Sequence, residues 1–271
     1  MRKSIRALLL ITFLAVLYIS CDDCPLHPPD EDCIDMPQNM VGWWECSDIK
    51  AHDLIYGNHG ELVGNVTFSE GKVGPAFNFD GQDSTYINIG NPPELDITGE
   101  LTLAAWVYIH EFVAHGGIIV KGLMYQGGDG QGPYGLGVNK ANAGPNSQKA
   151  MFEIRTENNV RNLVKSPGML EAQQWYFLVG TFTPGEAIRL YIDGALIAEE
   201  QISDSTIVDQ ANWPNSDVRI GDSQQTQMGD NYPGFLNGIV DEPMIFDRAL
   251  SNAEILAIYL SGSNGVCKPE I

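Results

Sequence analysis

From Val41 onward the chain alternates short runs of β-branched and aromatic residues with turns rich in glycine, asparagine and aspartate. Runs of this length, separated by turn residues, are typical of β-strands. Little but turns lies between the runs, so the pattern predicts an antiparallel two-sheet sandwich or a barrel rather than an α/β fold. The clearest runs occupy residues 61–68, 76–81, 85–90, 101–109, 116–122, 134–139, 150–156, 175–182, 188–199, 217–221 and 236–246.

Two short motifs define local structure within this pattern. Asp193 and Gly194 lie between two alternating apolar runs and predict a tight hairpin, because glycine tolerates the positive φ that a two-residue turn requires. Ser251 and Glu254 have the spacing of a capping box, which predicts the start of a helix, and Gly262 follows as its end. The sequence therefore predicts one short helix after the last strand.

The first forty residues do not follow the strand pattern. Residues 1–20 begin with basic residues and continue with an apolar run, which is the layout of a secretory signal peptide. The next residue, Cys21, lies where a bacterial lipoprotein signal places its lipid acceptor, so a lipidated and an unlipidated form are both open. Residues 21–40 are rich in Asp, Glu and Pro and bury too little apolar surface to fold alone. We predict a signal peptide over 1–20, a tether over 21–40 and one folded domain over 41–269.

The net charge of the chain limits which partners it can bind. The chain has a formal net charge of −20, and such a surface repels nucleic acid and anionic lipid headgroups. We therefore expect no nucleic-acid partner, and membrane contact only through a lipid anchor.

In an exported chain the five cysteines indicate disulfides, and without Cys21 an even number remains with its pairing open. Cys21 and Cys24 have the spacing of a zinc-binding pair, but no second pair completes such a site.

Several segments, taken together in their order, resemble a known family. FDG, the AW strand, the YIDG hairpin and the closing segment from Asp241 to Glu254 are similar to the LamG-like jelly-roll domain of the concanavalin A-like lectin/glucanase superfamily. The resemblance covers about residues 33–269 and implies an all-β jelly-roll sandwich of two antiparallel sheets. It also implies ligand binding, most often to carbohydrate or to another surface partner, and frequently a bound Ca²⁺. The segments that carry it are 40–46, 57–90, 95–109, 175–182, 188–199 and 237–269.

The resemblance further implies that the two ends of the domain meet. It places Cys33, before the first strand, beside Cys267, after the last helix, as one disulfide. Cys24 and Cys46 are then the remaining pair. A bridge that closes so long a loop is expected to stabilise the fold by roughly 4–5 kcal/mol in the chain-entropy model.

A structural calcium site is a second implication of the family resemblance. Asp53 and Asn58 lie in a turn that resembles the family's turn before its first long strand, and Asp241 lies in the last strand. Calcium takes about six to eight oxygen ligands from carboxylates, amide side chains and carbonyls, which makes these three residues the candidate ligands. The alternative is that Asp53 and Asn58 only form turns and that Asp241 accepts hydrogen bonds from a neighbouring backbone amide.

The motifs give catalysis little support, and we predict no catalytic residue. Retaining glucanases of this superfamily carry acids at alternate positions of one strand, so that both face one cleft. Asp241 and Glu242 are consecutive, and strict alternation would place Asp241 on the face of Ile245 and Glu242 on the face of Phe246. The scattered histidines are expected to be exposed to solvent: His52, His59, His110 and His115.

Loops supply the candidate ligand-binding residues. Residues 122–134 are too rich in glycine for a strand and too many for a tight turn, and long loops on a rigid sandwich commonly carry binding residues. Aromatic rings there can stack on sugars and polar side chains can bond hydroxyls, with local packing as the alternative for each. The candidates are Tyr125, Gln126, Asp129, Gln131 and Tyr134, with Trp213 and Tyr232 from two further loops.

These observations predict an extracellular or cell-surface binding module, of which an outer-membrane lipoprotein is one form. It is expected to bind a glycan, to be stabilised by Ca²⁺ and to be non-catalytic. Two alternatives stay open: a structural or adhesive surface protein that binds another protein, and a divergent enzyme that acts on glycosides.

Overall fold

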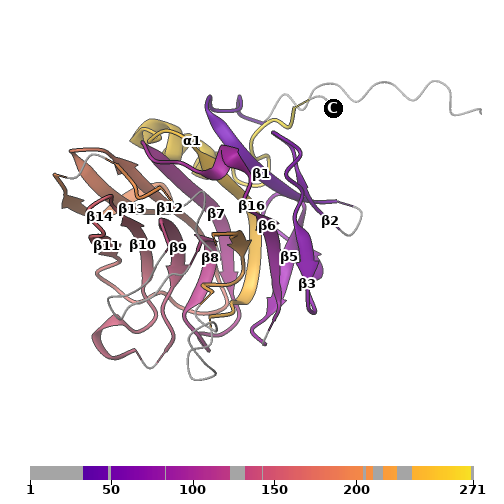
Figure 1. Cartoon of the computed structure of the whole chain (residues 1–271). Coiled ribbons are helices and arrows are strands. Elements are labelled where there is room, and N and C mark those ends of the chain that lie inside the picture. Colours follow the sequence, from indigo (N-terminus) through magenta and orange to yellow (C-terminus); the bar gives the residue numbers. More distant parts are fainter. Residues whose placement is uncertain are drawn as a thin grey trace, which may run out of the picture. The chain divides into compact units, whose positions relative to one another are not determined.

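Two antiparallel sheets packed face to face form the folded unit, Asp32–Ile271 (Figure 1). The fold is the predicted jelly-roll sandwich, and the one α-helix among the described residues, α1 (Asn252–Ser261), follows the last strand. The structure is a computed structural model that describes residues 33–47, 50–82, 84–122, 132–141, 143–203, 206–209, 216–224 and 234–269.

The first sheet has nine strands and is built around the last strand of the chain. Its strands are β1 (Met40–Ser47), β2 (Lys50–Asp53), β4 (Thr67–Glu70), β5 (Pro75–Asp80), β7 (Leu101–Ile109), β12 (Trp175–Thr183), β13 (Ala187–Ile192), β14 (Ala195–Gln201) and β16 (Asn237–Phe246). Their order is β14-β13-β12-β7-β16-β1-β2, with β5 also paired to β16 and β4 paired to β5. The strand β16 therefore joins three parts of the sheet, because it pairs with β7, β1 and β5.

The second sheet has seven strands in the order β11-β10-β9-β8-β15-β6-β3. The 3₁₀ helix η2 (Pro93–Leu95) lies in the connection from β6 to β7 of the first sheet, and η3 (Gly144–Asn146) lies between β9 and β10. The seven strands are β3 (Glu61–Val63), β6 (Tyr86–Gly90), β8 (Gly116–Lys121), β9 (Tyr134–Val138), β10 (Ala150–Arg155), β11 (Arg161–Lys165) and β15 (Val218–Ile220).

The single strand predicted over 61–68 is two strands, β3 and β4, that belong to different sheets. The chain turns between them at Gly64, whose φ is 72°. A Cβ at this position would lie 2.0 Å from the carbonyl oxygen of Ser84, so only glycine fits here. The glycine inside an apparently continuous strand pattern thus marks the change of sheet.

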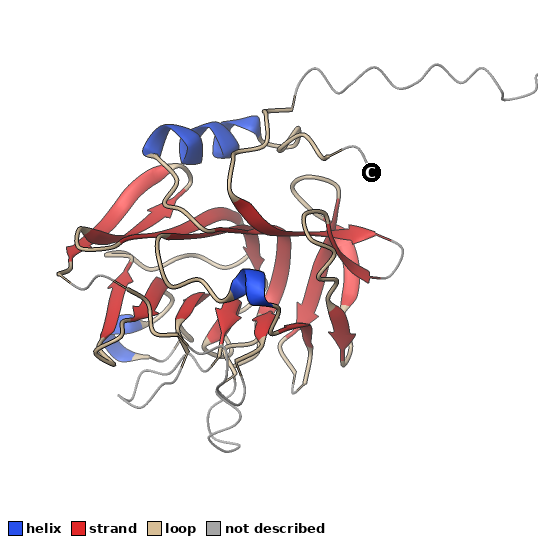
Figure 2. Ribbon diagram, turned by 45° about the horizontal axis from the view of Figure 1, so that its top comes forward, coloured by secondary structure: helices blue, strands red, loops and turns tan. Residues whose placement is uncertain are grey.

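Apolar side chains fill both faces of the nine-stranded sheet. Trp44, Phe77 and Phe152 belong to the core between the sheets. Trp43 and Trp106 point to the other face, where they pack with the buried residues of α1. Figure 2 shows α1 lying over this outer face, away from the seven-stranded sheet. The helix therefore covers apolar surface that the sandwich alone would leave in water.

The two local motifs have the predicted structures. Asp193 and Gly194 join β13 to β14 with φ values of 53° and 79°, as a two-residue hairpin turn requires. Ser251 caps α1 by accepting a hydrogen bond from the amide of Glu254, and the Glu254 carboxylate accepts one from the amide of Ser251. Both predictions are confirmed.

The predicted bridge between the ends of the domain is present. Cys33 and Cys267 form a disulfide across a sequence separation of 234 residues. Beside it, the amide of Ile34 donates to Gly265 and the amide of Cys267 donates to Ile34. The folded unit therefore begins before the predicted boundary at residue 41, and residues 33–39 belong to it. Cys46 carries a free thiol in the structure, and its predicted partner Cys24 lies outside the described residues, so that second bridge is not confirmed.

The predicted signal peptide and the candidate lipid acceptor Cys21 also lie outside the described residues. Across the part of the chain that the structure describes, no helix has the length and apolar character needed to cross a membrane.

Candidate functional site

A β-bulge in β16 determines where its two acids point. Asp241 lies opposite Trp106 and Met244 lies opposite Ala104, so the register shifts between them. Glu242 sits in this bulge with a φ of 49°, a left-handed conformation that is uncommon for residues other than glycine. The extra residue reverses the alternation, and the prediction that Asp241 shares a face with Ile245 is wrong.

Both acids consequently face outward, away from the core between the sheets. Asp241 is paired across the strands with Trp106, and Glu242 bonds Trp43, and both of these rings belong to the outer cluster beneath α1. Ile245 lies in the core between the sheets instead. The prediction of opposite faces for Asp241 and Glu242 is therefore wrong as well, for the same reason.

Asp241 binds a turn that is remote in sequence. Its Oδ2 accepts hydrogen bonds from the backbone amides of Lys72 and Val73 at 2.6 and 2.7 Å. Gly71 packs so closely that a Cβ there would lie 2.5 Å from the same oxygen. The carboxylate is 2% exposed, and burial raises its pKa against the effect of these amide donors. Asp241 thus holds the β4–β5 turn against β16.

Glu242 is buried as well. Its Oε2 accepts a hydrogen bond from Trp43 Nε1 at 2.7 Å, and its Oε1 lies 3.8 Å from Lys268 Nζ. Lys268 makes its shorter contact, 2.6 Å, with Glu45. Burial of Glu242 raises its pKa to about 8, with the nearby negative charge of Asp241 adding to the effect. Arg248, on the segment after β16, pairs with Glu254.

The three predicted calcium ligands do not come together. The Asp53 carboxylate accepts four backbone hydrogen bonds, from Trp43, Ile55, Tyr56 and Asn58, at 2.9–3.1 Å. The carbonyl oxygen of Asn58 accepts from the Trp44 indole. Asp241 meets the Lys72–Val73 turn rather than the Asp53–Asn58 turn. Among the described residues no group of three or more His, Cys, Asp and Glu side chains is arranged to hold a metal.

These side chains do not fit one shared calcium ion, because Asp53 already accepts four amide hydrogen bonds and Asp241 lies against a different turn. The structure instead has the alternative arrangement, in which Asp53 organises a turn and Asp241 accepts from a backbone amide.

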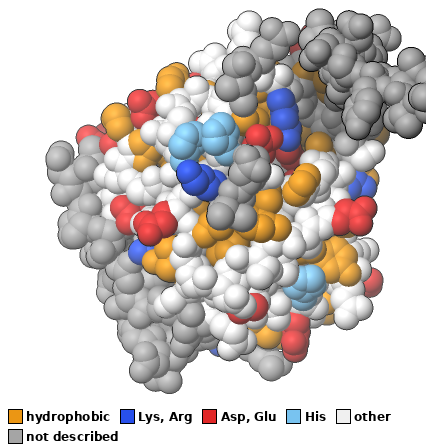
Figure 3. All heavy atoms as spheres, turned by 90° about the vertical axis from the view of Figure 1, so that its right-hand side faces the viewer, with side chains coloured by type: hydrophobic (Ala, Val, Ile, Leu, Met, Phe, Trp, Pro, Cys, Tyr) orange, Lys and Arg blue, Asp and Glu red, His pale blue; other side chains and the backbone are white. Residues whose placement is uncertain are grey.

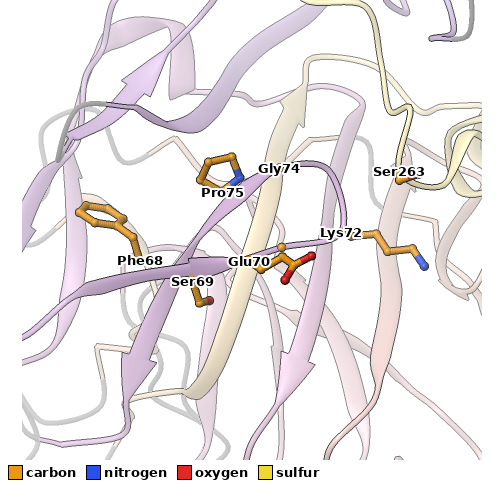
Figure 4. Close-up of a pocket in the computed structure, with 8 residues that line it drawn as sticks. Phe68, Ser69, Glu70, Lys72, Gly74, Pro75 and Ser263 are labelled. Atoms are coloured by element: carbon orange, nitrogen blue, oxygen red, sulfur yellow. The ribbon is translucent and has the colours of Figure 1, made fainter.

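A hollow of about 600 Å³ opens on the β4–β5 hairpin that Asp241 holds (Figure 4). We call it the hairpin hollow. The Phe68 ring is 37% exposed and supplies an aromatic surface. The turn between the strands closes on itself through a hydrogen bond from the Gly71 amide to the Gly74 carbonyl, 2.6 Å. The lining residues are Phe68, Ser69, Glu70, Gly71, Lys72, Gly74, Pro75 and Ser263.

None of these lining residues was among the predicted ligand contacts. The signal that could have found them is the aromatic Phe68 among polar residues, shortly before the glycine-bounded turn Gly71–Gly74. Pattern alone does not reveal that Ser263, beyond α1, completes the hollow, because that contact depends on the tertiary fold.

Only one of the predicted ligand contacts falls within the described residues. Tyr134 begins β9, is 1% exposed, and donates its hydroxyl to the carbonyl of Leu95 at 2.8 Å. The ring of Tyr134 is therefore not available to stack on a sugar, because β9 begins at this residue, as the predicted strand 134–139 has it, and turns the ring into the core. The other candidates lie outside the described residues: Tyr125, Gln126, Asp129, Gln131, Trp213 and Tyr232.

Histidines gather on the side of the molecule that Figure 3 shows. His52 and His59 stack with their ring centroids 4.3 Å apart; His59 is exposed as predicted, whereas His52 is half-buried. His59 Nδ1 already accepts a hydrogen bond from the amide of Asp53. The adjoining hollow of about 430 Å³ is lined in part by Lys50, whose positive charge disfavours a cation there. His110 and His115 are also half-buried.

The remaining buried acids are neutralised inside the fold. Glu153 on β10 bonds Arg161 Nε at 2.8 Å, and Asp222 bonds Arg219 at 2.8 Å. Burial raises the pKa of both carboxyls. These pairs stabilise the seven-stranded sheet and leave neither acid accessible to a substrate, since Glu153 is 5% and Asp222 is 0% exposed.

Sequence comparison supplies the family. The model of the concanavalin A-like lectin/glucanases superfamily matches residues 80–256. The chain belongs to this superfamily. The matched segment runs from the end of β5 into α1 and includes the bulged strand β16. No match was found among the curated proteins.

Solved structures of similar fold include binding domains. The binding domain of Paraclostridial Mosquitocidal Protein 1 aligns with a TM-score of 0.60 and 15% identity over 82% of this chain and 52% of that one. The binding domain of Botulinum neurotoxin serotype G gives 0.60 and 12% over 82% and 51%. This superfamily member therefore spans about half the length of those toxin domains.

An enzyme accessory domain is also similar. Domain 4 of AbnA, an extracellular arabinanase from Geobacillus stearothermophilus solved in complex with arabinotriose, aligns with a TM-score of 0.58 and 16% identity over 80% of this chain and 97% of that one. At these identities the likeness concerns the fold alone.

A calcium titration tests the assignment of Asp53 and Asp241 as amide acceptors. We expect the melting temperature to be the same in excess calcium and in excess EDTA, because a ligand stabilises only when it binds the folded state. The measurement is a thermal melt of wild type and Asp241→Asn. A concentration-dependent rise in wild type that Asp241→Asn removes would restore the metal role.

The buried Glu242 predicts a pH-dependent stability. An acid whose pKa is raised on folding contributes fully below its unfolded value, 4.5, and its contribution is lost as the pH rises towards about 8. The loss is on the order of a few kcal/mol. Thermal melts between pH 5 and pH 9 should therefore show a steeper fall for wild type than for Glu242→Gln, which keeps an acceptor for Trp43. Equal slopes in the two proteins would refute the assignment.

Proposed function

We propose that this superfamily member is an exported, non-catalytic module that binds glycan in the hairpin hollow. The observation that carries the proposal is the hollow itself, where the exposed Phe68 ring lies beside polar side chains. An aromatic face can pack against the C–H face of a sugar while neighbouring polar groups bond its hydroxyls. The bound arabinotriose of the arabinanase domain supports carbohydrate as the ligand class.

The buried acids support the non-catalytic part of the proposal. A glycosidase needs two carboxyl groups that flank the scissile bond. Asp241 and Glu242 are adjacent and 2% and 4% exposed, and each is committed to a hydrogen bond within the fold. They act as structural anchors.

We also infer export to the cell surface or the medium. The disulfide between Cys33 and Cys267 supports this, because such bonds persist in oxidising compartments. The basic and apolar start of the chain supports it too. Cleavage near Cys21 and lipidation of Cys21 stay predictions.

A protein partner is the second candidate function. Leu256 and Leu260 on α1 are 43% and 69% exposed and lie one helical turn apart, so they present an apolar strip that a partner protein can cover. The binding domain of Botulinum neurotoxin DC, of similar fold, was solved in complex with rat synaptotagmin II. An adhesive protein of this kind would depend on the leucines rather than on Phe68.

Truncation of Phe68 tests the glycan proposal. We expect Phe68→Ala to weaken binding of oligosaccharides about tenfold, the equivalent of about 1.4 kcal/mol, because the stacking surface is lost. The measurement is titration calorimetry with ligands first identified on a glycan array. Leu260→Ala is the matched control, since it removes an exposed apolar side chain elsewhere. If both variants bind sugar as well as wild type does, the hairpin hollow is not the site.

A further inference from the structure

Two charged side chains line the hairpin hollow, Lys72 and Glu70, and they differ in whether they are free to contact a ligand. Lys72 lines the hollow, but its Nζ lies 5.1 Å from the centroid of the Trp106 ring, where a cation is attracted to the aromatic face. Burial raises the pKa of the Asp193 carboxyl, and the positive charge of Lys72 opposes this rise. Figure 4 shows Lys72 extending away from Phe68 and Glu70. The ammonium is thus engaged at the far side of the hollow.

The Glu70 carboxylate is the charged group in the hollow that is free to contact a ligand. It is exposed, and within the described part of the chain no hydrogen bond or ion pair involves its carboxylate. Phe68 and Glu70 are two residues apart on β4, so their side chains leave the strand on the same face. An aromatic ring and a carboxylate on one face are together complementary to a cation, through cation–π attraction and a charge-assisted hydrogen bond.

The charge of the whole chain acts in the same direction. With 35 Asp and Glu against 15 Lys and Arg, the protein attracts positively charged ligands and repels negatively charged ones. An acidic sugar would be repelled by this overall negative charge and by the Glu70 carboxylate. A sugar that carries a protonated amine would be attracted by both.

We propose that the hairpin hollow binds saccharides that carry a protonated amino group, with the ammonium at Glu70 and the sugar ring against Phe68. The inference rests on the proposed glycan-binding function and specifies the chemical class of its ligand. Asp241 takes part as a positioning residue, since it holds the turn whose residues Gly71 and Lys72 line the hollow.

The experiment compares two oligosaccharides that differ only at nitrogen. Glucosamine oligomers, with free amines, and the same oligomers after full N-acetylation are titrated into wild type by calorimetry below pH 6, where the amine is protonated. We expect wild type to bind the free amine form at least tenfold more tightly. Raised salt should reduce this preference, since screening weakens the ion pair.

Two variants test whether the preference for the free amine arises at Glu70. Glu70→Gln should bind both oligomers equally, because it removes the carboxylate and keeps the shape of the side chain. Glu200→Gln is the matched control: it removes one exposed acid from β14, away from the hollow, and should keep the preference of wild type. A loss of preference in both variants would mean that only the overall charge matters, and would overturn the inference.

The failures of the two proposals are distinguishable. Equal binding of the two oligomers by wild type, weakened by Phe68→Ala, would refute the amine preference and leave glycan binding standing. No binding of either oligomer, together with no hit on a glycan array, would refute both.

Discussion

Two buried carboxylates, Asp241 and Glu242, face the same side of β16 because the strand bulges at Glu242. The segments that pack against this side of the strand supply their hydrogen-bond donors. A carboxylate taken out of water is costly unless several donors satisfy it. Asp241 obtains its donors from the amides of Lys72 and Val73, and Glu242 obtains one from the Trp43 indole. Each acid thus draws a distant segment of chain onto the last strand: Asp241 the β4–β5 turn, and Glu242 the first strand.

This arrangement also determines what the surface can do. The β4–β5 hairpin stands at the edge of the nine-stranded sheet, and the contact to Asp241 ties its turn to β16 in addition to the pairing of β5 with β16. Held in place, it presents Phe68 and Glu70 on one face, which suits the binding of a ring with a polar substituent. The same contacts remove both acids from chemistry. The proposed binding surface and the burial of Asp241 and Glu242 therefore both depend on the bulge.

Sequence reasoning succeeded where structure is determined locally. The Asp193-Gly194 turn and the Ser251–Glu254 cap each depend on residues that are close in the chain, and both were predicted. The Cys33–Cys267 bridge followed from the family resemblance. The hairpin hollow was not predicted, because Asp241 and Lys72 are 169 residues apart and the bulge reverses the expected alternation. No local pattern marks Glu242 as a residue with positive φ, and one such residue changes the face of every side chain after it.

Hydrogen exchange of individual amides tests the anchoring role of Asp241 most directly. The amides of Lys72 and Val73 should be strongly protected in wild type and should exchange at least tenfold faster in Asp241→Ala, because their acceptor is gone. Amides of the β9–β10 ladder, which lies in the seven-stranded sheet away from Asp241, serve as the internal control and should keep their protection. Unchanged exchange at Lys72 and Val73, with the ladder still protected, would contradict the account.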